Sequence, residues 1–122
     1  MDKVNISEKL SQFNDYYNPR IIGELNGQDV KAVKLMGEFV WHHHDNEDEL
    51  FLVLKGHLRI EMEDGAVELD EGEMFVVPKG VLHNPVAAQE CHVLLVERKS
   101  TRHTGDVVTA KTRSVADQLR PL

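Results

Sequence analysis

The chain has 122 residues, the size of one domain, and carries a formal charge of −7. A net negative surface without a basic stripe repels phosphate backbones, so we expect no nucleic acid as a partner. No apolar run approaches the ~20 residues that a membrane helix needs, and the first twelve residues contain no apolar signal core. We therefore expect no membrane contact and a cytoplasmic protein. The single cysteine, Cys91, cannot form an internal disulfide, and we expect it to be buried as a small apolar side chain.

The N-terminal segment, residues 1–20, has the pattern of a short helix. Asn5 or Ser7 can cap it, and Glu8 stands three residues after Asn5, as in a capping box. Pro19 would end this helix. Its apolar side would consist of Leu10, Phe13 and Tyr17.

Residues 21–99 read as short strands separated by turns. Asn26 and Gly27 lie between two apolar stretches, as do Asp64 and Gly65, and both pairs are strong hairpin signals. Many short strands that follow one another about every 8–12 residues indicate a sandwich or a closed barrel. The tail, residues 100–122, is polar. It forms either an extended arm or a short helix over SVADQL, and the pattern does not choose between them.

Two of the expected strands, residues 50–54 and 93–96, are apolar on both faces. An isolated barrel would expose one of these faces to water, so each strand needs a cover. The N-terminal helix or a second copy of the chain can supply it. We favour a homodimer.

A run of three histidines, His42 to His44, is the strongest chemical signal. Residues two apart on a strand point the same way, so His42 and His44 share one face and His43 points to the other. A hairpin after the acidic stretch would return the carboxylate of Glu49 to the two rings. His83, which follows a Pro-Lys-Gly turn, is the candidate for a fourth ligand. Three imidazoles and one carboxylate suit one divalent Zn, Fe, Mn, Ni or Co ion.

Each of these signals alone has a simpler interpretation. A histidine run is more often a solvated surface feature, and His83 on its own is more often a polar turn residue. The acidic stretch 45–49 lacks the spacing and the glycine of a calcium-binding EF-hand loop. The combination of residues and their spacing is what favours a metal site.

Two spaced motifs carry a resemblance to a known family. The first reads Gly37, four residues, His42-His43-His44, four residues, Glu49, six residues, Gly56. The second reads Gly72, five residues, Pro78-Lys79-Gly80, two residues, His83. Together they resemble the two motifs of the cupin superfamily, and the texture of residues 21–106 is similar to small single-domain bacterial cupins of the cupin 2 type.

The resemblance implies an all-β, double-stranded β-helix or jelly-roll barrel over residues 21–99, with a short N-terminal helix and a polar C-terminal tail. It also implies a metal held inside the barrel by His42, His44, Glu49 and His83. The chain departs from the pattern in two places. Gly37 stands one residue closer to the histidines than usual, and Ala87 replaces an asparagine that is not a usual ligand. Using His43 instead of His42 would break the His-x-His-x4-Glu spacing.

Other residues have expected places in such a barrel. Phe51 and Val53, which share the parity of Glu49, and Val40 are candidates to line its interior. One of Cys91 and His92 must face inward, and that residue can line the pocket. Trp41 shares the parity of His43 and is expected to pack or to contact a second copy. The residues expected at the surface are His43, His57 and His103.

Three functions fit these observations. The first is a metal-dependent enzyme, oxygenase-like or isomerase-like, that acts on a small organic molecule in the barrel. The second is a non-catalytic sensor or storage module that binds a metal or small ligand. The third is a structural role with a vestigial site. We find no nucleophile motif, no phosphate loop and no identifiable catalytic residue, and the fold alone cannot decide.

Overall fold

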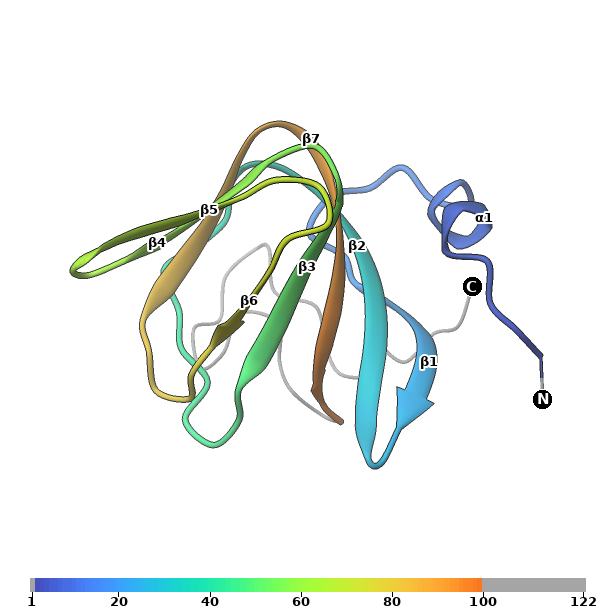
Figure 1. Cartoon of the computed structure of the whole chain (residues 1–122), viewed down its shortest axis with the longest axis horizontal. Coiled ribbons are helices and arrows are strands. Elements are labelled where there is room, and N and C mark those ends of the chain that lie inside the picture. Colours follow the sequence, from blue (N-terminus) through green and yellow to red (C-terminus); the bar gives the residue numbers. More distant parts are fainter. Residues whose placement is uncertain (1, 100–122) are drawn as a thin grey trace.

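The computed structural model describes residues 2–99 and shows a largely antiparallel β architecture (Figure 1). The expected arm or helix of the tail and His103 lie outside these residues. The elements in chain order are α1 (Ile6–Leu10), β1 (Arg20–Leu25), β2 (Gln28–Glu38), β3 (Glu49–Lys55), β4 (Leu58–Met62), β5 (Gly65–Leu69), β6 (Met74–Val77) and β7 (His83–Arg98).

The long strand β7 connects the two parts of the sheet. Five strands follow the order β1-β2-β7-β3-β6, and β4 pairs with both β5 and β7. The first part of β7 lies against β4, and its second part lies between β2 and β3. In Figure 1 the β4–β5 ribbon extends away from the larger group of strands. This arrangement, with all pairs antiparallel, is the jelly-roll barrel that the two motifs implied.

Alternating side chains of β2, β3 and β7 fill the interior of the barrel. Val33 pairs with Val93 across β2 and β7, and Val93 pairs with Val53 on β3. All three are almost fully buried. Because strand side chains alternate, every second residue of these strands enters one core while the residues between them face outward.

The two predicted hairpins are present. Asn26 and Gly27 both have positive φ angles, 50° and 76°, as a two-residue turn of type I′ requires. In the second hairpin the turn lies one residue earlier than expected, because Met62 already pairs with Gly65. Gly56 has a structural reason to be glycine: a Cβ atom there would lie 2.9 Å from the carbonyl oxygen of Glu90.

The N-terminal helix is shorter than predicted. Asn5 caps α1 by accepting a hydrogen bond from the Glu8 N–H at 3.1 Å, but the helix ends at Leu10. Phe13 and Tyr17 are buried without being helical. Tyr17 has a φ angle of 55°, and its N–H donates to the carbonyl of Lys34 on β2 at 2.9 Å. The backbone therefore pairs with the barrel where the helix was expected to continue.

This N-terminal segment covers part of the outer face of the sheet. Leu10 and Phe13 pack on Ala32 of β2 and on the partly buried Leu54 of β3. The N-terminal segment, one of the two covers expected for strand 50–54, thus covers the C-terminal end of that strand. Within residues 2–99 there is no helix with the length and apolar composition needed to span a membrane.

Candidate metal centre

His42 and His83 are neighbours although 41 positions separate them in the chain. They form an antiparallel β-bridge in which the N–H of each donates to the carbonyl of the other, both at 2.9 Å. His42 lies in the connection from β2 to β3, and His83 is the first residue of β7. The bridge brings the two imidazole centroids to 4.3 Å.

His44 and Glu49 complete the group. The carbonyl of His44 accepts a hydrogen bond from the N–H of Gly80 at 2.8 Å, which ties the histidine segment to the turn that precedes β7. Glu49 opens β3 opposite Val77 of β6. Its Oε1 atom lies 3.5 Å from Nε2 of His44 and 3.4 Å from Nε2 of His83.

The geometry of this group fits a common ion. All four side chains are buried, and one potential ligand atom from each lies within 4.8 Å of the others. Ligand atoms that share one ion at ~2.1 Å lie no more than ~4.2 Å apart, so small side-chain adjustments suffice. Oε1 of Glu49 and Nε2 of His83 also lack an aligned hydrogen bond, although both are buried. Buried polar atoms of this kind are what a bound cation would satisfy.

Two backbone carbonyls orient the rings. Nδ1 of His42 lies 2.8 Å from the carbonyl oxygen of Val40, and Nδ1 of His83 lies 2.9 Å from that of Val81. A carbonyl only accepts, so each Nδ1 carries the hydrogen and donates it. The lone pair is then on Nε2, the tautomer that histidine ligands commonly adopt in metal sites.

The protonation state of His42 also suits a ligand. Burial, followed by the neighbouring ring of His83, lowers the pKa of His42 to about 4. The imidazole is therefore neutral at physiological pH, as a metal ligand must be.

A second buried group lies behind Glu49. Nζ of Lys31 on β2 is 2.9 Å from Oε1 of Glu97 on β7, and both side chains are almost completely buried. Burial by itself raises the pKa of Glu49. The hydrogen bond with Glu97, together with the proximity of the His44 and His83 rings, outweighs burial and holds this pKa well below its usual range. Burial and the charge of Glu49 raise the pKa of Glu97, against the opposing effect of Lys31. The opposite directions of the two pKa shifts place the negative charge mainly on Glu49, while Glu97 beside Lys31 is shifted toward the neutral acid.

Sequence reasoning missed this group. Lys31 shares the inward parity of Val33 on β2, and Glu97 shares that of Leu95 on β7. Their alternation with known inward-facing residues was therefore the one sequence signal that could have predicted that Lys31 and Glu97 point into the barrel. It is weak, because a charged strand residue usually lies at the surface.

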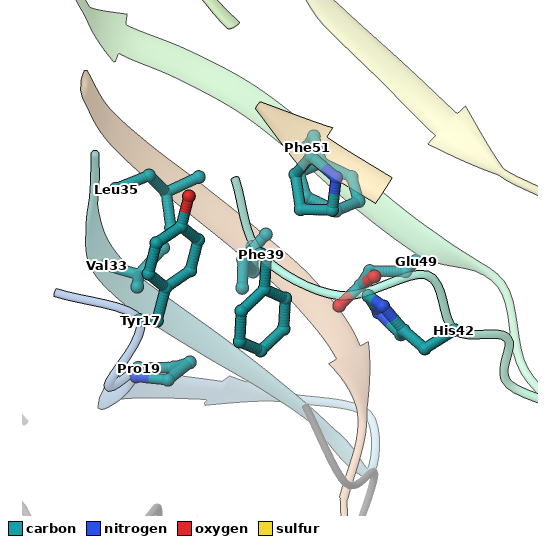
Figure 2. A pocket seen from close by; sticks show the side chains of 10 residues that line it. Tyr17, Pro19, Val33, Leu35, Phe39, His42, Glu49 and Phe51 are labelled. Carbon is teal, nitrogen blue, oxygen red and sulfur yellow. The ribbon is translucent and has the colours of Figure 1, made fainter. Parts of the chain in front are cut away.

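An apolar cavity adjoins the candidate metal centre. It has an empty volume of about 340 Å³, counting its open mouth. Figure 2 shows His42 and Glu49 close together at one end, with the ring of Phe39 beside them and that of Tyr17 on the far side of Phe39. Phe51 lines it, as expected. The lining residues are Tyr17, Pro19, Val33, Leu35, Phe39, His42, Glu49, Phe51, Pro85 and Leu95.

The other predicted residues divide between core and surface. Val53 is buried in the core, and Val40 packs against it, but neither lines this cavity. Cys91 is the inward member of its pair and is fully buried. His92 contacts Glu90, a surface residue. His57 is half-exposed and is held by Asp70 and Glu68, and Trp41 remains 43 % exposed.

The comparisons with known proteins agree with this architecture. The sequence profile described as "Cupin domain" matches residues 33–97. The chain is 37% identical over 95 residues to "Uncharacterized protein YdbB" of Bacillus subtilis (strain 168), covering 77% of this chain and 78% of that protein.

Solved structures show the same likeness. A cupin-2 domain containing protein from Shewanella frigidimarina is 45% identical, with a TM-score of 0.77, and the match covers 78% of this chain and 93% of that one. Protein NMB1881 from Neisseria meningitidis is 33% identical, with a TM-score of 0.73 and coverage of 80% and 99%. The chain belongs to the cupin family, and its fold carries a three-histidine, one-glutamate cluster of the kind that holds a metal ion.

Proposed function

We propose that the protein binds one divalent transition metal ion through His42, His44, Glu49 and His83, and that it is a metal-dependent enzyme acting on a small organic molecule. The observation that carries the proposal is the convergence of four buried ligand atoms within 4.8 Å, next to an apolar cavity. The reaction class that fits is oxygenase-like or isomerase-like. Zn, Fe, Mn, Ni and Co all accept this ligand set.

The metal would supply Lewis acidity and, if it is redox-active, electron transfer to a substrate. The residues of the chain would orient the ligands, balance part of the metal's charge and exclude water. The carbonyls of Val40 and Val81 fix the tautomers of His42 and His83, and burial keeps the His42 ring neutral by lowering its pKa. Glu49 contributes one negative charge, which offsets part of the charge of a divalent ion. The apolar walls exclude water from the substrate side.

A non-catalytic binding module is the second candidate, and one observation favours it. Besides the proposed ligands, Tyr17 is the only titratable side chain among the residues that line the described cavity. Its hydroxyl donates to the carbonyl of Gly37, and burial raises its pKa far above neutrality. The wall therefore offers no group poised to act as a second acid or base near pH 7.

Metal analysis of the purified protein tests the first part of the proposal. We expect about one equivalent of a transition metal per chain. Glu49→Ala and His83→Ala should each lower the bound metal at least about tenfold, because each removes one ligand. His57→Ala is the matched control, because His57 contacts carboxylates at the surface and should leave the metal content unchanged. Full stoichiometry in both ligand variants would refute the site.

Turnover separates the two candidates. The metal-loaded protein is given diketones and catechols while oxygen uptake is recorded, and the products of a wider metabolite panel are followed by mass spectrometry. Turnover that disappears in His83→Ala would support the enzyme. Tight binding without turnover across the panel would favour the sensor or storage module.

A further inference from the structure

The wall of the cavity has almost no means of binding a polar molecule. Among the described residues that line it there is no lysine, arginine, serine, threonine, asparagine or glutamine. The hydroxyl of Tyr17 already donates to a backbone carbonyl. Besides the acceptor capacity of the Tyr17 oxygen, a polar group that entered the cavity could bind only at the end formed by His42 and Glu49. Polar groups elsewhere would lose their contacts with water without replacement.

Aromatic rings bracket this polar end. The ring of Phe39 stacks on Tyr17 with centroids 4.6 Å apart and meets His42 edge-on at 5.5 Å. Phe51 meets His83 edge-on at 6.1 Å. Figure 2 shows Tyr17, Phe39 and Phe51 around the space next to His42 and Glu49. Rings in this arrangement favour a flat apolar body over a branched polar one.

The size of the cavity limits that body. The enclosed space that a water-sized molecule can enter measures only about 30 Å³, far below the ~300–1,000 Å³ typical of ligand pockets, and the rest of the 340 Å³ is open to solvent at the mouth. The enclosed part therefore admits only a small group, and a body as large as one ring would lie partly in the mouth, against the apolar wall.

We infer that the cavity takes a small molecule with one metal-chelating end and an uncharged, apolar body no larger than a single ring. The inference rests on the proposed metal site and adds the substrate class to it. Sugars, sugar acids and molecules with a second charged group are disfavoured, because their remaining polar atoms would meet Val33, Leu35 and Leu95. Each polar group left unpaired should weaken binding about tenfold or more.

Three chelators with the same hydroxamate end and different bodies test this class. The protein is loaded with Co(II), whose visible spectrum reports a ligand entering its coordination sphere, and is titrated with benzohydroxamate, acetohydroxamate and gluconohydroxamate. Benzohydroxamate should bind at least about tenfold tighter than acetohydroxamate, and gluconohydroxamate should bind the most weakly. Equal affinities, or tightest binding of the polyhydroxylated chelator, would overturn the inference while leaving the metal site intact.

A cavity-filling variant gives a matched control. Val33→Phe fills the apolar end and should remove the preference for benzohydroxamate in a protein whose circular dichroism shows that it is folded. Val4→Phe makes the same change at a side chain that is 42% exposed and should preserve the preference. A retained preference in a folded Val33→Phe protein would contradict the inference.

Failure to hold cobalt would refute the proposed metal site instead. In that case the cavity is tested alone, by adding toluene to the metal-free protein and recording methyl NMR signals. Val33, Leu35 and Leu95 should shift, and unchanged signals would overturn the inference.

Discussion

Glu49 stands between two buried groups of different chemistry. On one side are the imidazoles of His44 and His83, and on the other is the carboxyl group of Glu97 with the ammonium of Lys31. Removing one member of a buried charged pair is costly, because the remaining charge has no counter-ion and no water. Lys31 is thus the internal cation that balances the negative charge behind the candidate metal centre.

Removing that cation should destabilise the metal-free protein. We expect Lys31→Met to lower the free energy of unfolding by about 3 kcal/mol, as measured by urea denaturation. The double variant Lys31→Met/Glu97→Leu, which also removes the buried carboxyl group, should recover a large part of this loss. A double variant less stable than Lys31→Met would contradict this account of the pair.

Cys91 should be inert in the folded protein. Its side chain is fully buried, and burial raises the pKa of the thiol from 9.0 to about 11. A raised pKa means that the neutral thiol is favoured, so the reactive thiolate becomes abundant only as the pH approaches 11. At pH 8, modification of the native protein by a thiol reagent should be at least about 100-fold slower than that of the urea-unfolded chain. Comparable rates would show that Cys91 is accessible.

At the scale of elements, the N-terminal segment is part of the barrel rather than an appendage. Phe13 packs on Ala32 with Leu10, and its carbonyl accepts a hydrogen bond from the ammonium of Lys34 at 2.7 Å. The same ammonium lies 5.2 Å from the centre of the Phe13 ring. Further along, Tyr17 and Pro19 form part of the cavity wall. Anchoring of this segment therefore shapes the cavity.

Loss of the Phe13 ring should destabilise the fold measurably. Phe13→Ala removes a buried aromatic side chain and should lower the free energy of unfolding by about 3 kcal/mol in urea denaturation. Val4→Ala alters a side chain that is 42% exposed on the same segment and should change it by less than about 0.5 kcal/mol. Equal effects would mean that the segment does not depend on this contact.

The sequence predicted the residues of the candidate site better than it predicted the local structure around them. Strand alternation predicted that His42 and His44 share one face, but they lie in the connection between β2 and β3, where only His42 forms an isolated β-bridge. The two spaced motifs selected Glu49 and His83, and the structure brings these two residues together with His42 and His44. Helical spacing of Leu10, Phe13 and Tyr17 predicted a longer helix, which is wrong because the backbone at Tyr17 pairs with Lys34 instead. Such long-range pairing leaves no local signal, so the contribution of Tyr17 to the cavity was not predictable.

At the scale of the whole molecule, one face of the sheet remains apolar and uncovered in the described chain. Leu50 of β3 lies between Val76 and Val96, and Leu52 lies between Met74 and Leu94. Met74 is 53% exposed and Val76 is 39% exposed, and the other four are partly buried. A contiguous apolar face of this kind is typical of a protein–protein interface.

We expect this face to join two copies of the chain. Light scattering at micromolar concentration should give twice the chain mass of 13.9 kDa. Val76→Glu places a charge on the face and should shift the protein toward monomer. Leu25→Glu alters an apolar side chain that is 57% exposed on β1 and should leave the mass unchanged. A monomeric unmodified protein would contradict the expected dimer.

The central claim is that four side chains from separate parts of the chain share one cation inside the barrel. The most direct test is a crystal structure of the metal-loaded protein with anomalous data collected on both sides of the metal's absorption edge. We predict a single strong anomalous peak bounded by Nε2 of His42, His44 and His83 and by a carboxylate oxygen of Glu49. A peak elsewhere, or a fully loaded protein in which any of these four side chains points to solvent, would contradict the account.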